Sequence, residues 1–145
     1  MKKLVLLSLF IIPFFFQSKA QFTLTNTSTI SLCELRNGTW PLDLQRIIKK
    51  NDTLYQLQFR DQQYTTEVNM SILRFGSLTQ LKYFQKCLAA LKLGSNGDQA
   101  DFKEYAVKRT DVKKEVCYTL TLTEGSVINF KQAEADKLAA AIKTL

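Results

Sequence analysis

Alternating hydrophobic and polar residues near the middle of the chain predict a β-hairpin. Between positions 53 and 60, Tyr55, Leu57 and Phe59 alternate with polar side chains, which is the period of a half-buried strand. After a short turn, the alternation resumes between positions 64 and 75. We therefore expect these two segments to pair as antiparallel strands.

Strands are also expected before this hairpin, and a helix after it. Segments 29–35 and 44–49 have β-type composition, and turn-forming residues separate them. After the hairpin, Ser77 can cap a helix and Gly94 can end it, so we place that helix at about 77–92. Its apolar residues recur at three- and four-residue spacing and form one stripe: Leu81, Phe84, Leu88 and Leu91.

The second half of the chain repeats this order of elements. Hydrophobic patterning predicts strands at 102–108, 114–123 and 126–130. A turn is expected at Thr110-Asp111, and a final amphipathic helix at about 132–144. Both halves are therefore expected to contain a strand meander followed by a helix.

The two halves can also be aligned residue by residue. Segment 72–75 matches segment 127–130, and with Gly76 as one inserted residue Phe84 aligns with Leu138. Duplication of an ancestral unit explains this match, and so does coincidence, since a strand followed by an amphipathic helix is a common order.

The predicted fold class is α+β, a mainly antiparallel sheet with both amphipathic helices packed on it. The sheet is built from two β-meander-plus-helix units, at about 29–93 and 101–145. This plan resembles the architecture of some single-stranded nucleic-acid-binding folds. The expected core comprises Tyr55, Leu57, Phe59, Val68, Met70, Ile72, Leu81, Phe84, Leu88, Leu91, Val116, Tyr118, Leu120, Leu122, Ile128, Phe130, Leu138 and Ile142.

The first twenty residues have the features of a secretory signal peptide. Lys2 and Lys3 precede an apolar run that is too short to span a bilayer, and small residues follow it. Cleavage is expected between Ala20 and Gln21, which leaves a single α+β domain over 21–145 with no membrane span. The short Lys-Lys signal is typical of bacterial export, so we expect a periplasmic or extracellular protein.

Export changes the charge that a partner would meet. The signal segment carries three of the lysines and no acid, so its removal lowers the formal net charge from +7 to +4. That modest charge and the exported location both argue against a nucleic-acid partner. The expected partner is an unknown protein or envelope component, and the oligomeric state stays open. One basic cluster near a predicted hairpin tip is either an anionic-partner patch or a solvated strand end: Lys108, Arg109, Lys113 and Lys114.

The residue inventory argues against several kinds of catalysis. The chain contains no histidine, which removes Ser-His-Asp and Cys-His catalysis and every histidine-based metal site. No phosphate-binding or dinucleotide-binding glycine motif is present, and no cofactor is expected. Carboxylates that could work in pairs fall mostly in predicted turns: Glu34, Asp43, Asp52, Asp61, Glu67, Asp98, Asp101 and Glu104.

Three cysteines, Cys33, Cys87 and Cys117, permit one disulfide and one free thiol. We name Cys33 and Cys117 as the first candidate pair, because both fall on predicted strands. The alternative is that the cysteines are small buried apolar residues.

The sequence favours a small exported, non-catalytic binding or interaction module. Two alternatives stay open: a small cell-envelope enzyme with paired carboxylates, and a structural or inhibitory protein that covers a partner's surface. Strand aromatics either line a ligand groove or pack under the helices: Tyr55, Phe59, Tyr64, Tyr105 and Tyr118.

Overall fold

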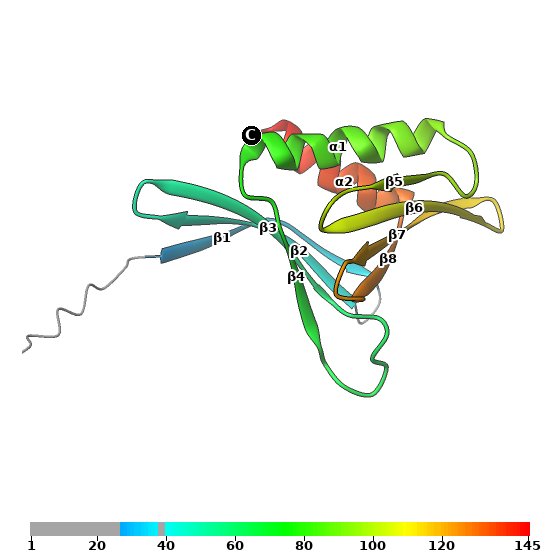
Figure 1. The fold of residues 1–145 in the computed structure, drawn as a ribbon, viewed down its shortest axis with the longest axis horizontal. Helices are drawn as coiled ribbons and strands as arrows, with labels where there is room; N and C mark the ends of the chain where they lie inside the picture. Colours follow the sequence, from blue (N-terminus) through cyan, green and yellow to red (C-terminus); the bar gives the residue numbers. More distant parts are fainter. Residues whose placement is uncertain (1–26, 38–39) are drawn as a thin grey trace, which may run out of the picture.

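The computed structural model describes residues 27–37 and 40–145. The expected signal segment and the Ala20–Gln21 cleavage position lie outside the described residues. Within them, the chain forms two antiparallel four-stranded sheets and two helices, so the α+β prediction is confirmed. Figure 1 shows both helices on the same side of the two sheets.

The first unit is a meander of four strands in chain order, followed by a helix. The expected antiparallel hairpin of the third and fourth strands is confirmed, and Ser77 caps the helix as predicted, accepting a hydrogen bond from the backbone N–H of Gln80. The elements are β1 (Thr27–Asn37), β2 (Trp40–Lys49), β3 (Asp52–Arg60), β4 (Met70–Arg74) and α1 (Leu78–Leu93).

The second unit has the same order of elements, and its sheet is also a simple meander. The last helix begins at its predicted start, Gln132, and the backbone N–H of the preceding Lys131 donates to the Glu134 side chain. The elements are β5 (Gln99–Asp101), β6 (Tyr105–Val112), β7 (Glu115–Leu122), β8 (Val127–Lys131) and α2 (Gln132–Lys143).

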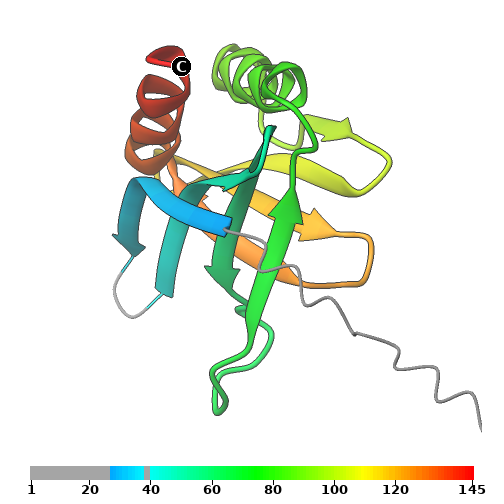
Figure 2. The same cartoon turned by 90° about the vertical axis from the view of Figure 1, so that its left-hand side faces the viewer.

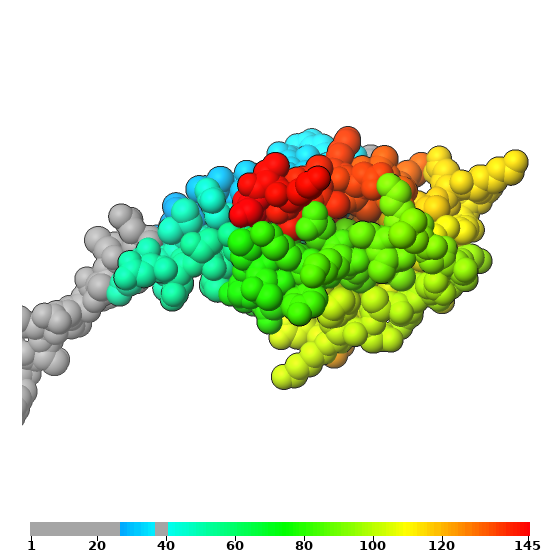
Figure 3. All heavy atoms as spheres, turned by 90° about the horizontal axis from the view of Figure 1, so that it is seen from above, coloured from blue at the N-terminus to red at the C-terminus, as the bar shows by residue number. Residues whose placement is uncertain are grey.

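The helices link the two units. Helix α1 packs on β5 and β6 of the second sheet as well as on β3, while α2 contacts β1 together with β7 and β8. Seen from above, the two helices lie side by side (Figure 3), and Gln85 Nε2 of α1 donates to the Ala139 carbonyl oxygen of α2 at 2.7 Å. Each unit therefore depends on the other to bury its helix.

One hydrophobic cluster beneath the helices contains buried residues of both units. Leu57, Phe59, Leu81, Tyr118 and Leu138 are completely or almost completely inaccessible to solvent. Most of the expected core is confirmed. The core also contains residues outside the expected set: Leu35, Leu42, Leu44, Leu73, Phe75, Tyr105, Val107 and Ala135.

The predicted face of the fourth strand is wrong. Val68 is exposed and lies in the loop before β4, and Met70 is 40% exposed at the start of the strand. Pairing of β3 with β4 sets Leu73 opposite Leu57, so the odd-numbered residues of β4 face the core and Ile72 is only half-buried. The prediction failed because both alternating sets of residues in this strand contain apolar side chains.

The second half also departs from its expected boundaries. Thr110 and Asp111 lie inside β6, and the chain turns at Lys113 and Lys114, both with positive φ. Strand β5, whose backbone pairs with β6, was not expected. A three-residue strand is too short for its side chains to show a period.

Residues that align between the two halves are buried or exposed alike. Leu73 and Phe75 are buried, as are their counterparts Ile128 and Phe130, while Arg74 and Asn129 are both exposed. Strand register extends the match, because Arg46 lies opposite Tyr55 and Arg109 lies opposite Tyr118. The two units thus share their strand phase as well as their order of elements, whatever their ancestry.

Candidate functional site

An aromatic cavity of about 260 Å³ opens at the junction of the two units. One side is formed by the end of β4 and the first turns of α1, and the other by the loop between β5 and β6. The lining residues are Arg74, Phe75, Gln80, Tyr83, Phe102, Lys103, Glu104 and Tyr105. We call this space the aromatic cavity.

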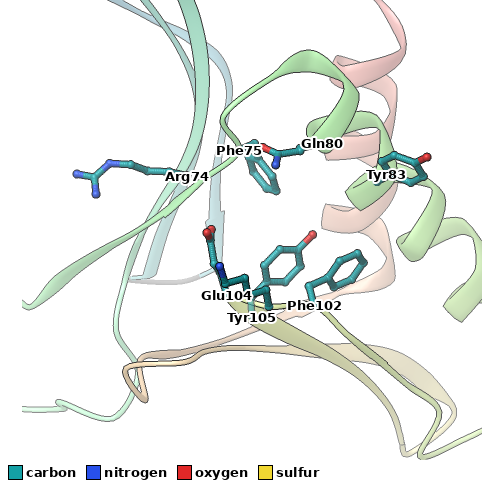
Figure 4. A pocket seen from close by; sticks show the side chains of 8 residues that line it. Arg74, Phe75, Gln80, Tyr83, Phe102, Glu104 and Tyr105 are labelled. Atoms are coloured by element: carbon teal, nitrogen blue, oxygen red, sulfur yellow. The ribbon is translucent and has the colours of Figure 1, made fainter.

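Three rings form the base of the aromatic cavity. Phe102 stacks on Tyr105 with ring centroids 4.4 Å apart, and Tyr105 meets Phe75 edge-on at 6.2 Å. Phe84 of α1 supports both, at 5.2 Å from Phe75 and 6.0 Å from Tyr105. Figure 4 shows Phe75, Tyr105 and Phe102 gathered around the cavity with the Gln80 amide above them. These contacts hold the rings in place before any ligand arrives.

Backbone hydrogen bonds hold the loop that carries Phe102. Its backbone N–H donates to the Tyr105 carbonyl oxygen at 2.8 Å, which closes a tight turn between β5 and β6. The backbone N–H of Thr123 donates to the Glu104 carbonyl oxygen at 3.1 Å, which ties this loop to the end of β7. The loop is therefore part of the second sheet's framework.

Polar groups surround the aromatic base. The side chains of Gln80, Lys103 and Glu104 contribute an amide, a cation and a carboxylate to the lining, whereas Arg74 extends away from the rings (Figure 4). Burial raises the pKa of the Tyr105 hydroxyl, and Cys87 and Glu104 add to the shift, so the phenol is a hydrogen-bond donor even at mildly alkaline pH.

The cavity also presents apolar surface to solvent. Phe102 is 36% exposed and Tyr83 is 60% exposed, although both are large aromatic residues. Exposed aromatic surface beside a cavity with converging polar groups is typical of a binding site. A ligand with an apolar group would remove this surface from water.

Arg109, expected in an anionic-partner patch, is used inside the fold. Its Nη1 donates to the carbonyl oxygens of Leu91, Lys92 and Gly94, at 3.0, 2.9 and 2.5 Å. Its Nε lies 2.8 Å from Asp111, and this hydrogen bond raises the pKa of the guanidinium. Arg109 therefore caps the C-terminus of α1. Since only 11% of its side chain is exposed, the guanidinium is not free for a partner.

The other basic residues of that patch are exposed. Lys113 and Lys114 form the turn between β6 and β7, and Lys108 lies on β6. The structure therefore brings only part of the predicted cluster to the surface. Its role as an anionic-partner patch stays a prediction.

The cysteines are free thiols in this structure: Cys33 and Cys117 are half-buried and Cys87 is buried. Cys33 lies on β1 and packs against the core, whereas Cys117 lies on β7. Cys117 sits between Val116 and Tyr118, which face the core, so its own side chain points to the opposite face. This placement does not support the expected Cys33–Cys117 bridge, and a thiol count in solution tests it.

Among the candidate acids, Asp61 is the buried one, with 2% of its surface exposed. Its Oδ1 accepts hydrogen bonds from the backbone N–H groups of Gln63 and Val127, both at 3.0 Å, which is a structural role. Asp98 accepts from the backbone N–H of Ser95 and closes a loop in the same way. In the described part of the chain, no group of three or more Cys, Asp and Glu residues is placed to hold a metal ion.

The sequence alone indicates only part of the aromatic cavity. Of the strand aromatics, Tyr105 lines it, whereas Tyr55, Phe59 and Tyr118 are buried in the core. The hydrophobic pattern does not mark Phe75, Gln80, Tyr83 or Phe102 as binding residues. The available signal is Phe102 itself, an aromatic residue between two charged neighbours at the start of the strand predicted at 102–108.

No protein-family model matches the chain, and no curated protein is significantly similar to it. In residues 27–37 and 40–145, neither helix has the length and apolar character needed to cross a membrane. The chain's own geometry is therefore the basis for inferring a function.

Proposed function

We propose that the chain is an exported, non-catalytic binding module that holds an apolar or aromatic group of its ligand in the aromatic cavity. The observation that carries this proposal is the exposed Phe102 ring, stacked on Tyr105 at the base of a cavity lined with polar groups. A cleft of this kind, with a few convergent polar groups, is the usual form of a small-ligand site.

The size of the aromatic cavity indicates how much of a ligand it can take. Its volume of about 260 Å³ lies below the range of roughly 300–1,000 Å³ that encloses a whole drug-sized ligand. It suits a single ring or branched aliphatic group, with the rest of the ligand outside. A ring placed against Phe102 would gain about 0.5–1.5 kcal/mol beyond its burial.

The proposed location follows from the N-terminal signal. Export to the periplasm or the cell exterior would place the module among envelope components and other exported proteins. A formal charge of +4 after signal removal gives little electrostatic drive toward nucleic acid. An apolar group on an envelope component or a protein is therefore the proposed target.

An NMR titration tests this function. The ¹⁵N-labelled chain without residues 1–20 is titrated with p-cresol, indole and cyclohexanol as probes for phenolic, indolic and aliphatic groups. At least one probe is expected to shift the amide signals of Gln80, Phe102 and Glu104 in a saturable manner.

Two substitutions of exposed hydrophobic residues complete the test. Phe102→Ala is expected to remove the saturable shifts, while Val112→Ala, at the far end of β6 and 49% exposed, leaves them unchanged. Shifts that map elsewhere, or that survive Phe102→Ala, would refute the proposed site. So would the absence of saturable shifts with all three probes.

A further inference from the structure

Strand β4 has a free edge beside the aromatic cavity. It is the last strand of the first sheet, with β3 as its only hydrogen-bonded neighbour in the described residues. The backbone N–H of Phe75 donates to the Tyr55 carbonyl oxygen at 2.7 Å, and this bond sets the phase of the pairing. Ser71 and Leu73 therefore direct their backbone groups toward β3, whereas Ile72 and Arg74 direct theirs away from it.

The equivalent edge in the second unit is occupied. Val127 and Asn129 correspond to Ile72 and Arg74, and residues 61–62 of the first unit pair with them. Val127 receives a hydrogen bond from the Gln62 backbone N–H at 2.8 Å and donates its own N–H to Asp61 at 3.0 Å. Asn129 donates its backbone N–H to the Gln62 side chain at 2.9 Å and accepts from it at 3.3 Å.

The two edges thus differ in one respect. All four outward backbone groups of Val127 and Asn129 are satisfied by another segment of the chain. For Ile72 and Arg74, no such segment lies alongside in the described residues. The second unit therefore shows how an added segment occupies this edge, and the first unit has an edge of the same kind that no described segment occupies.

A groove of about 400 Å³ runs along the free edge of β4. Ile72, Leu73 and Arg74 form one wall, and Glu104 with residues 122–124 forms the other. The groove shares Arg74 and Glu104 with the aromatic cavity, so the two spaces adjoin at these residues. Figure 2 shows β4 at the border of the first sheet, with the second unit beside it.

We propose that the ligand of this module is an extended peptide that adds to the free edge of β4 and inserts one aromatic or large aliphatic side chain into the aromatic cavity. This inference rests on the proposed function and names its ligand class. Outward N–H and C=O groups at alternate residues match an extended polypeptide backbone, and strand addition of this kind is a known mode of peptide recognition.

The groove also predicts which residue the peptide prefers at a second position. Side chains on one face of an added strand recur every two residues, so the neighbour of the anchor on that face lies beside Leu73. Glu104 and Glu124 line that part of the groove, while Arg74 projects from the other face of β4. We therefore expect Lys or Arg two positions from the anchoring side chain.

Binding of defined peptides tests the inference. Capped hexapeptides of Ser and Thr carry a central Phe, with Lys two positions before or after it, because either strand direction fits an edge. Fluorescence anisotropy measures their affinity for the chain without residues 1–20. We expect Phe to Ala in the peptide to weaken binding at least about tenfold, and Lys to Glu to weaken it about threefold to tenfold.

Two changes separate strand addition from simple insertion of a side chain. N-methylation of the peptide amides that face β4 removes their donors and is expected to weaken binding about tenfold. In the protein, Arg74→Pro is compared with Arg74→Ala. Both lose the guanidinium, but only proline loses the outward N–H, and proline is tolerated on such an edge. We expect Arg74→Pro to weaken binding about tenfold more than Arg74→Ala, with both variants folded by circular dichroism.

The outcomes distinguish the two proposals. Loss of binding with Phe102→Ala, but no effect of N-methylation or of Arg74→Pro, would overturn strand addition and leave the aromatic cavity as the site. Failure of the peptides of both directions to bind, while the small aromatic probes do bind, would also overturn strand addition and leave the aromatic cavity as the site. Self-association of the chain that Arg74→Pro abolishes would overturn the peptide ligand in favour of a second copy.

Discussion

Val127 donates its backbone N–H to the Asp61 carboxylate at 3.0 Å, although the two residues are 66 positions apart. Asp61 belongs to the loop after β3, and Val127 begins β8 of the second sheet. The buried carboxylate is the hydrogen-bond acceptor for the Val127 backbone N–H, which would otherwise be unpaired at the edge of the second sheet. This bond joins the two units at the point where their sheets meet.

Removal of the Asp61 carboxylate is expected to destabilise the protein. Asp61→Ala leaves the backbone N–H groups of Gln63 and Val127 without an acceptor, and the cost should be about 2–3 kcal/mol of unfolding free energy. Asp61→Asn keeps one carbonyl oxygen and should cost less. Urea unfolding measures both, with Asp52→Ala at the exposed start of β3 as the control. Equal stability of Asp61→Ala and Asp52→Ala would contradict the role.

Arg109 is expected to matter for stability, unlike its basic neighbours. Arg109→Ala removes a donor from three carbonyl oxygens at the end of α1, so the thermal midpoint should fall by several degrees. Lys108→Ala, at the adjacent exposed position, should leave the midpoint within about one degree. Differential scanning fluorimetry makes the comparison. Equal thermal midpoints for Arg109→Ala and Lys108→Ala would mean that Arg109 acts as a surface cation of the basic patch.

Local patterns could be predicted because they depend on local chemistry. The apolar stripe of α1 and its cap at Ser77 are properties of one short segment, and the structure has both. The phase of β4 is different. Met70 and Ile72 on one face compete with Leu73 and Phe75 on the other, and only pairing with β3 decides between them.

The aromatic cavity could not be predicted, for a similar reason. Phe75 directly follows β4 of the first unit and Phe102 lies in the second unit, so no sequence period relates them. Their meeting depends on α1, which packs over β5 and β6 of the other unit. Each aromatic residue alone was equally consistent with a core position.

Alkaline pH is expected to weaken the fold through Cys87. Burial raises the pKa of this thiol from 9.0 to about 11, so between those values the unfolded chain loses a proton that the folded chain keeps. The contribution of Cys87 to stability should therefore be constant below pH 9 and decline between pH 9 and 11, by at most about 3 kcal/mol. Cys87→Ala should show a shallower decline in urea unfolding over this range. An unchanged decline would assign it to other groups, such as Tyr105.

A thiol count tests the cysteine arrangement. Cys33 and Cys117 lie on strands of different sheets and face different sides, so three alkylated thiols are expected in the denatured protein without reductant. Intact mass after alkylation gives the number directly. One alkylated thiol, rising to three after reduction, would instead support a bridge and would require the strands to move.

A substitution behind the aromatic cavity should change binding without changing the fold. An added Cβ at Gly76 would lie 2.9 Å from the Gln80 Oε1, so Gly76→Ala must displace the Gln80 amide that lines the cavity. The backbone there needs no positive φ, and the unfolding free energy should stay within about 0.5 kcal/mol. Affinity for the aromatic probes, or for the hexapeptides, should change several-fold.

In a Gln80→Ala background, Gly76→Ala should have no further effect on this affinity, because the displaced side chain is gone. A full effect of Gly76→Ala in that background would show that it acts through the backbone and not through the amide.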